Sequence, residues 1–463
     1  MENVQDKDQQ TLLPEPRLPI EPVDRLIEPF SRFLHVESAS GIVLLLVTVV
    51  ALILANSSFS DSYLRFWQTP LSLSVGSWQM NYSLQHWIND GLMAVFFFVI
   101  GLEVKREIVL GELKNLRAAI IPLVAALGGM VIPAAFFLLL QWGEAGQRGW
   151  GIPMATDIAF VVGCLAILGT RVPKSLRILL LTLAIIDDIG AILVIAIGYT
   201  DELHLNALAW GFGGIGLIGL LLQIGVRSLP LYVLLGLGVW FGFHESGVHA
   251  TIAGVILGLI TPAQAWISQG LLAEFVQKLG DVLQGNSGLL GDERQALVES
   301  VTVAAQESTS PVERLEAALH PWVGFGIMPV FALANAGIPI QGAGFRESIV
   351  MALIVGLAVG KPVGILLFSG LTVLLGWAKL PDDMTWGILG ASGILAGIGF
   401  TMSLFIAGLA LTGDLLDAAK LGILLGSALS AVVGMLLLVW LLPRPGQTSL
   451  SNTPLTTSLI NNQ

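Results

Sequence analysis

Two adjacent aspartates, Asp187 and Asp188, lie inside the otherwise apolar segment 180–198. At the rise of an α-helix this segment is long enough to cross a bilayer. A carboxylate at the centre of a membrane helix costs about 2.5–3.5 kcal/mol on insertion scales, and two neighbouring negative charges also repel each other. Such a pair is tolerated only where it faces other protein groups or water and serves a function. The pair therefore predicts a binding site for a cation or a proton.

Asp157 and Lys361 are further charged residues within apolar segments. An ammonium group in hydrocarbon needs a counter-ion, so we expect Lys361 to pair with Asp187 and to leave Asp188 as the main ion-binding carboxylate. The alternative for Lys361 is snorkelling toward water. Asp157 can cap the N-terminus of a half-helix or help to bind a cation, and both roles can hold.

The aspartate pair also predicts a mechanism. A hard monovalent cation prefers oxygen ligands, and protons bind the same carboxylate oxygens. High cytoplasmic pH would free these oxygens for the cation, and an acidic exterior would return protons to them. Competition of this kind, combined with alternating exposure of the site to the two sides of a membrane, gives antiport.

The composition is that of a membrane protein with several spans. Hydrophobic residues make up 54% of the chain and charged residues 12%, against about 25% charged residues in an ordinary soluble domain, and the mean hydropathy is +0.81. The net charge of -11 argues against nucleic acid as a partner. Cys164 is the single cysteine of the chain, which excludes an intrachain disulfide. No cofactor is expected.

The sequence predicts an all-α polytopic membrane protein with about twelve transmembrane helices. The apolar segments are 41–56, 86–107, 118–141, 153–169, 175–199, 205–224, 229–243, 248–261, 322–337, 347–371, 385–410 and 417–442. With the N-terminus in the cytoplasm, most of the 22 lysines and arginines fall on the cytoplasmic side, as the positive-inside rule requires. Both termini are therefore expected to be cytoplasmic.

The regions between and around these segments have their own signatures. Residues 1–34 are expected to form a cytoplasmic tail with an interfacial segment, 35–442 the membrane domain, and 443–463 a second cytoplasmic tail. Within the membrane domain, 263–320 is predicted to be a long cytoplasmic loop that is solvated and contains a partly helical stretch, with a regulatory module as the alternative. Residues 70–84 alternate with period two, which predicts a small β-hairpin. A lone hairpin is marginal in water, so we expect it to pair with a second copy of the chain.

A weak internal repeat links two of the apolar segments. The same residue types recur at the same offsets, Thr156, Phe160 and Gly163 in one segment and Thr401, Phe405 and Gly408 in the other. The two segments start on opposite sides of the membrane, so the repeat would have inverted topology. Pro153 precedes the first motif and Gly397–Gly399 the second, which predicts two discontinuous helices near an ion site.

Eight short motifs resemble NhaA-type bacterial sodium/proton antiporters, in order and over about residues 35–442. They are Gly101–Glu107, Ala155–Phe160, Ala184–Ala191, Ser246–Thr251, Leu319–Trp322, Phe331–Gly337, Gly360–Gly364 and Gly399–Phe405. Inverted-topology repeats are the known architecture of this family. The resemblance therefore implies two inverted three-helix units whose discontinuous helices cross, in the bacterial inner membrane.

The resemblance also implies an activity and roles for residues. Cytoplasmic Na⁺ or Li⁺ would be exchanged for external H⁺, with more protons entering than sodium ions leaving, so that the membrane potential drives the exchange. Asp187 and Asp188 match the family's essential pair and would bind Na⁺, Thr156 and Asp157 match its motif in the fourth span, and Lys361 matches its membrane lysine. The 70–84 hairpin resembles the contact that makes members of the family homodimers.

Regulation by pH is the least direct of these implications. The residues that match the family's regulatory regions are Glu103, Arg106, Glu107, His249, Glu316 and His320. The Glu103–Glu107 group can instead be a cytoplasmic anchor with a local ion pair, and His249 an ordinary histidine at a span end. Ala317 stands where many members have a histidine. Asp90 can attract cations or simply begin a helix.

Three other functions compete with antiport. A transporter of an organic solute could share the fold, although the apolar segments offer few polar or aromatic groups for such a substrate. Intramembrane aspartyl proteases also use two membrane aspartates, but on different helices and with a Gly-x-Gly-Asp turn that these segments lack. The Asp-Asp-x-x-Asp metal motif of prenyl-transfer enzymes is not completed, because Ala191 occupies its last position.

Overall fold

The computed structural model describes residues 37–75, 78–114, 116–200, 203–284, 291–340 and 347–442. The tails predicted at 1–34 and 443–463 lie outside the described residues, as does the centre of the predicted hairpin at 76–77. Within the described residues the protein is mostly helical, with one two-stranded sheet.

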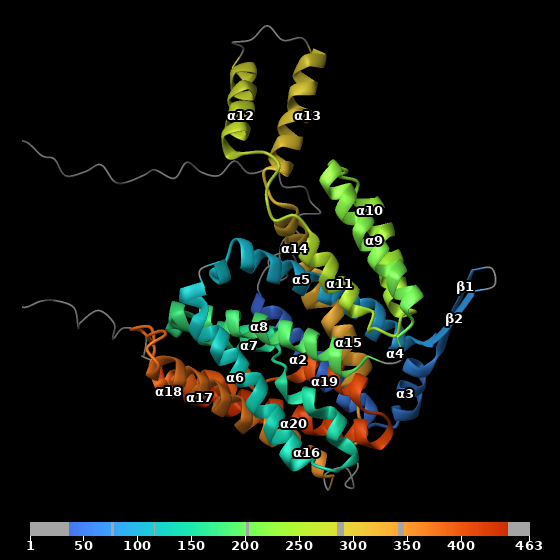
Figure 1. Ribbon diagram of the computed structural model, residues 1–463, viewed down its shortest axis with the longest axis vertical. Helices are drawn as coiled ribbons and strands as arrows, with labels where there is room; N and C mark the ends of the chain where they lie inside the picture. The colour runs from blue at the N-terminus through green and yellow to red at the C-terminus, as the bar shows by residue number, and fades with distance from the viewer. Residues whose placement is uncertain are drawn as a thin grey trace, which may run out of the picture.

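The helices follow one another along the chain with short connections (Figure 1). The first half comprises α2 (Glu37–Ala55), α3 (Ser60–Gln68), α4 (Leu84–Trp87), α5 (Met93–Val109), α6 (Leu116–Leu140), α7 (Ile158–Leu168), α8 (Lys174–Gly198), α9 (Leu205–Ile224) and α10 (Leu229–His244). The second half comprises α11 (Thr251–Ile260), α12 (Gln269–Leu283), α13 (Gly291–Glu307), α14 (Pro311–Trp322), α15 (Met328–Asn335), α16 (Ser348–Val355), α17 (Lys361–Leu374), α18 (Trp386–Ala396), α19 (Phe400–Ala410) and α20 (Gly413–Leu441).

Several of these helices have the length and composition of membrane spans. In the described part of the chain, six helices are long and apolar enough to cross a membrane, and up to nine spans result if each bent pair of helices counts as one. The apolar helices α10 and α11 are shorter. The protein is therefore a polytopic membrane protein, while the number of twelve spans stays a prediction.

The two predicted interruptions are present. The 3₁₀ segment Ala145–Met154, here called η3, is followed by extended backbone and then by α7, with a bend of 41°. Helices α18 and α19 are separated by Gly397–Gly399 and bent by 47°. The two repeat motifs do not occupy equivalent places, because Thr156 lies in the extended break whereas Thr401 lies in the first turn of α19. The inverted repeat stays a prediction.

The predicted β-hairpin is confirmed. Strand β1 (Pro70–Val75) pairs antiparallel with β2 (Trp78–Ser83), and Pro70 lies opposite Ser83. The hairpin projects from the side of the helical bundle, beyond α3 and α4 (Figure 1). A two-stranded sheet has two edge strands, and on β1 the carbonyl of Leu71 accepts a hydrogen bond from Trp87 Nε1.

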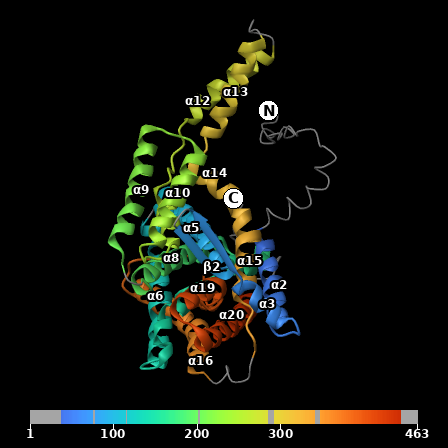
Figure 2. The ribbon, with the colours of Figure 1, turned by 90° about the vertical axis from the view of Figure 1, so that its right-hand side faces the viewer.

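Between α11 and α15 the structure differs from the sequence prediction in where the helix that contains the next span begins. The predicted loop 263–320 contains α12 and α13, which project from the bundle (Figures 1 and 2), and its last part belongs to α14. Helix α14 begins at a capping box in which Ser310 and Glu313 bond reciprocally to each other's backbone. The charges of α14 lower its hydropathy, which is why the predicted span starts only at 322; the Ser310-x-x-Glu313 spacing was the available signal.

Two parts of the bundle differ in packing. Helices α6, α8, α17 and α20 belong to the packed body, whereas α9 and α10 lie beside one another at its edge (Figures 1 and 2). Large apolar side chains on this outer pair are exposed: Trp210, Phe212, Leu220, Val233, Leu234 and Leu237. An exposed apolar surface of this extent is typical of contact with lipid.

Glycines let α6 and α17 approach closely. A Cβ atom on Gly128 would overlap the carbonyl oxygen of Gly364, and a Cβ on Gly364 would overlap that of Gly128. Small residues at such contacts are common between membrane helices. The close approach brings the start of α17, with Lys361, against the middle of the bundle, where Lys361 is fully buried.

Candidate functional site: a crossing of two interrupted helices

The two interrupted helices bond directly to each other where they cross. The backbone N–H of Asp157 donates to the carbonyl of Ile398 at 2.7 Å. Thr156 Oγ1 lies 2.9 Å from the carbonyl oxygen of Ala396, and Ser403 Oγ donates to Ile152 O at 2.8 Å. These bonds satisfy backbone groups that an interrupted helix would otherwise leave unpaired in an apolar interior. We call this region the crossing.

Asp157 caps both helices that leave the crossing. Its Oδ1 accepts from the backbone N–H of Phe160 at 3.3 Å, as the N-cap of α7. Its Oδ2 accepts from the backbone N–H of Thr401 at 3.0 Å and from the Thr401 hydroxyl, at the start of α19. Helix N-termini carry positive partial charge, so one buried carboxylate offsets two of them. The capping role expected for Asp157 is thus present.

Lys361 supplies the positive charge at the crossing. Its Nζ is 2.8 Å from Asp187 Oδ2 and also donates to the carbonyl of Met154, the last residue of η3. The C-terminal end of a helical segment carries negative partial charge. Lys361 thus lies in contact with Asp187, and because the lysine side chain is fully buried, it does not snorkel toward water.

The two adjacent aspartates are held differently. Asp187 Oδ2 lies 2.6 Å from Thr156 Oγ1 in addition to its contact with Lys361. Asp188 forms no ion pair with any described residue, and it is 2% exposed. Within the described structure, Oδ1 of Asp187 and Oδ1 of Asp188 are buried and have no hydrogen-bond partner.

Unpaired buried oxygens are rare because each costs about 1–3 kcal/mol, and more when the group is charged. Two such oxygens belong to consecutive residues of α8, and one of these residues, Asp187, is in contact with Lys361. Oxygen ligands suit a hard cation such as Na⁺, and the same oxygens can take a proton. The arrangement can therefore hold either ion.

A second group of charges lies where α14 packs along α5. Arg106 forms an ion pair with Glu316, and His320 Nδ1 is 3.7 Å from Glu103 Oε1. Glu107, the neighbour of Arg106, is half-buried on the same helix. We call these five residues the α5–α14 cluster. The structure thus brings together five of the six residues that the sequence associated with pH regulation.

His249 lies apart from that cluster, near Asp90. Its Nε2 is 3.8 Å from Asp90 Oδ1, and its Nδ1 is 2.8 Å from Thr251 Oγ1. Its ring also meets the ring of Phe405 edge-on at 5.4 Å, which connects it to α19. Asp90 lies in the π-helical turn Ile88–Leu92 before α5 and faces histidines.

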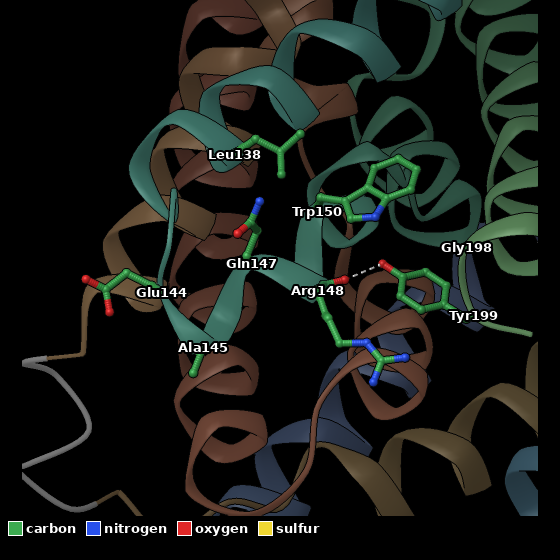
Figure 3. Close-up of a pocket in the computed structure, with 8 residues that line it drawn as sticks. All are labelled: Leu138, Glu144, Ala145, Gln147, Arg148, Trp150, Gly198 and Tyr199. Carbon is green, nitrogen blue, oxygen red and sulfur yellow. Dashed lines mark hydrogen bonds between the residues drawn. The ribbon is translucent and has the colours of Figure 1, made fainter. Parts of the chain in front are cut away.

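The site carboxylates do not line the surface pocket beside η3. That hollow, of about 650 Å³, lies at the far end of η3 from the crossing (Figure 3). Tyr199 closes one side of it, with its hydroxyl donating to the carbonyl of Arg148 at 2.9 Å. Its lining is Leu138, Glu144, Ala145, Gln147, Arg148, Trp150, Gly198 and Tyr199, which includes none of the predicted site residues.

Sequence reasoning missed some members of the crossing. Thr401 and Ser403 bond across it, and the carbonyls of Met154, Ala396 and Ile398 accept its hydrogen bonds. Thr401 and Ser403 belong to a motif that the sequence singled out, so their polarity was the available signal. The carbonyls carry no sequence signal, because every residue has one.

Comparison with known proteins shows which family and which proteins this chain is similar to. A family model described as Na⁺/H⁺ antiporter 1 matches residues 31–438. A protein of Rhodopirellula baltica named Na(+)/H(+) antiporter NhaA is 55% identical over 428 residues, 92% of this chain and 97% of that protein. One of Rhizobium meliloti with the same name is 51% identical over 425 residues, 92% and 97% of the two chains. A Vibrio vulnificus protein named Na(+)/H(+) antiporter NhaA 2 is 49% identical over 432 residues, 93% and 96% of the two.

Proposed function

The chain belongs to the Na⁺/H⁺ antiporter 1 family, and we propose that it exports cytoplasmic Na⁺ or Li⁺ in exchange for external H⁺. It is a transporter and not an enzyme. More protons would enter than sodium ions leave, so the exchange is electrogenic. The observation that carries the proposal is the pair of buried carboxylates, each with one unpaired oxygen among the described residues, at the crossing of two interrupted helices.

Competition between protons and Na⁺ at this pair is the mechanism. Asp188 is the main cation ligand, because among the described residues it has no ion-pair partner that would have to be displaced. Asp187 contributes its second oxygen while Lys361 holds the first. When protons occupy the carboxylates, Na⁺ loses its ligands; when the protons leave, Na⁺ regains them. Exposure of the site first to one side and then to the other couples the two fluxes.

Neighbouring groups keep this pair in place. Thr156 bridges Asp187 and the carbonyl of Ala396, and its single hydroxyl proton can serve one of the two acceptors at a time. Because the hydroxyl group of Thr156 can rotate between these acceptors, its oxygen can also be directed toward a bound cation. Asp157 is a positioning residue, because its carboxylate is occupied by the caps of α7 and α19.

The proposed topology has twelve spans. It combines the six long spans with α2, α5, α10, α11 and the two interrupted helices. The units α6–α8 and α16–α20 would be inverted repeats. Both termini, including tails 1–34 and 443–463, and the 263–320 region would face the cytoplasm of a bacterial cell with the protein in its inner membrane.

Regulation and assembly complete the proposal. The α5–α14 cluster would adjust exchange to cytoplasmic pH, because its ion pairs join the two helices nearest the proposed cytoplasmic entrance. His249 would contribute from the other end of α11. Two copies of the chain would form a homodimer through the 70–84 hairpin, whose strand edges can pair with those of a second hairpin.

Everted membrane vesicles test the proposed exchange. Respiration acidifies their interior, and a pH-sensitive dye reports loss of the gradient when Na⁺ or Li⁺ is added. We expect Na⁺ and Li⁺ to collapse the gradient in vesicles with the protein, and a control with an empty plasmid to show no response. No response to either cation from neutral to alkaline pH would rule the proposal out. Stimulation by a clamped membrane potential in proteoliposomes would distinguish electrogenic from neutral exchange.

A further inference from the structure

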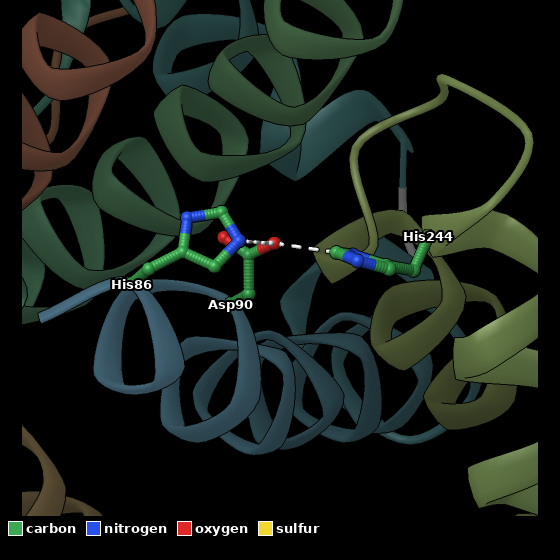
Figure 4. A group of neighbouring side chains, drawn as sticks. All are labelled: His86, Asp90 and His244. Carbon is green, nitrogen blue, oxygen red and sulfur yellow. Dashed lines mark ion pairs between the residues drawn. The ribbon is translucent and has the colours of Figure 1, made fainter. Parts of the chain in front are cut away.

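Three of the six histidines of the chain converge on one carboxylate away from the crossing. Asp90 Oδ2 lies 3.5 Å from His86 Nε2 and 3.4 Å from His244 Nδ1 (Figure 4). Asp90 Oδ1 lies 3.8 Å from His249 Nε2. His86 and Asp90 precede α5, while the other two histidines belong to the end of α10 and the turn before α11. We call these four residues the histidine cluster.

The ring nitrogens that face away from Asp90 have their own partners. His244 Nε2 is 3.2 Å from Tyr82 Oη, and His249 Nδ1 is 2.8 Å from Thr251 Oγ1. A second hydrogen bond of this kind fixes the ring of a metal-binding histidine and leaves its other nitrogen directed at the ion. The ring of His86 is stacked on that of Tyr82, with centroids 4.3 Å apart, so this tyrosine orients two of the three rings.

The distances between the ligand atoms fit tetrahedral coordination of a metal ion. Zinc–ligand bonds of about 2.0–2.1 Å place neighbouring ligand atoms of a tetrahedron about 3.3–3.5 Å apart. The two contacts of Asp90 Oδ2 have these lengths, and one nitrogen or oxygen atom from each of His86, Asp90 and His244 lie within 4.8 Å of one another. His249 Nε2 faces the other oxygen of Asp90, Oδ1, and would become the fourth ligand by moving toward this group of three. His86 Nε2 is buried and has no hydrogen-bond partner among the described residues, so it is available to an ion.

We propose that the histidine cluster binds one divalent transition metal ion, of which Zn²⁺ is the prototype. Three imidazoles and one carboxylate are a typical zinc ligand set, whereas Na⁺ prefers oxygen ligands alone. This site is therefore chemically distinct from the proposed transport site. A bound ion joins the start of α5 to the α10–α11 turn, and so fastens the outer helix pair to the packed body of the protein.

The proposal is tested on the full chain, purified in detergent without a polyhistidine tag and stripped of metal with a chelator. Co²⁺ serves as the spectroscopic probe, and Zn²⁺ is titrated calorimetrically. We expect one ion per chain, the intense visible absorption of four-coordinate Co²⁺, and displacement of Co²⁺ by Zn²⁺. Zn²⁺ should also raise the thermal unfolding temperature. Because the test measures metal binding, its outcome does not depend on whether the protein exchanges Na⁺.

Variants separate this site from adventitious binding. His86→Gln and His244→Gln should each weaken Zn²⁺ binding by at least about tenfold, and Tyr82→Phe by about tenfold, as expected for ligands and for a group that orients them. His204→Gln and His320→Gln, which change histidines outside the cluster, should bind like the unaltered protein. The proposal would be overturned if the His86 and His244 variants bound Zn²⁺ as tightly as the unaltered protein. Binding by the unaltered protein that does not saturate at millimolar Zn²⁺, or a six-coordinate Co²⁺ spectrum, would also overturn it.

Discussion

The crossing and the α5–α14 cluster contain similar charged groups but differ in their access to water. Lys361 and Asp187 have no exposed side-chain surface, whereas Arg106 is 41% and His320 53% exposed. Water can replace a partner lost by Arg106 or His320, although Glu316 beside them is only 10% exposed, while at the crossing each charge depends on the protein. Similar substitutions should therefore have large effects at the crossing and smaller ones in the cluster.

The largest effect is expected from Asp188→Asn. The amide cannot take up and release a proton and binds Na⁺ more weakly than a carboxylate, so exchange should be lost altogether. The fold should persist, because no described ion pair depends on Asp188. The measurement is the response of everted vesicles to Na⁺, with size-exclusion chromatography in detergent to check folding. Asp61→Asn, at an exposed aspartate of α3, is the matched control. Full turnover in the Asp188 variant would refute its role as ion ligand.

Asp187→Asn should lower stability as well as activity. Removing one partner of a buried pair leaves an uncompensated charge, at a cost of about 3–5 kcal/mol, here on Lys361. Thermal unfolding in detergent measures the loss. The double variant Asp187→Asn with Lys361→Met should regain part of the stability, since it removes both charges. An unfolding temperature equal to that of the unaltered protein in the single variant would mean that the pair contributes nothing.

Thr401→Val tests the hydrogen bonds between the two interrupted helices. It removes the hydroxyl donor to Asp157 and leaves the backbone donor, so we expect a loss of about 1–3 kcal/mol and slower exchange. Thr372→Val is the control, because the equally buried Thr372 hydroxyl bonds, among the described residues, to Phe368 in its own helix. Equal losses of unfolding free energy in the two variants would contradict a special role for the hydrogen bond between the two interrupted helices.

The smallest effect on the maximal rate of exchange is expected from Arg106→Gln. Because Arg106 is 41% exposed and Glu316 only 10%, the loss of stability should lie between the about 0–1 kcal/mol of an exposed pair and the about 3–5 kcal/mol of a buried one. If the cluster regulates exchange, the pH of half-maximal activity should shift while the maximal rate is kept. Arg65→Gln, which breaks an exposed pair with Asp61 on α3, should leave the pH profile in place. An unaltered profile for the Arg106 variant would make the cluster a structural ion pair only.

The crossing also shows how far the sequence could be interpreted. Pro153 and Gly397–Gly399 indicated both interruptions, because proline and glycine act on the backbone where they occur. The hairpin followed from alternation alone. Helix α14 was placed too late, because hydropathy does not register a helix that begins with charged residues. The convergence of His86 and His244 on Asp90 was not anticipated, because His244 lies far along the chain from the other two residues.

The sequence by itself determined which segments are apolar, where they are interrupted and which carboxylates must lie among them. Hydropathy and backbone preference are local properties, so they can be read from neighbouring residues. Only the tertiary structure decided that Asp157 caps two helices at once, that Lys361 joins Asp187 to the end of η3, and that oxygens of Asp187 and Asp188 stay unpaired. These outcomes depend on the distances between residues hundreds of positions apart, which packing sets.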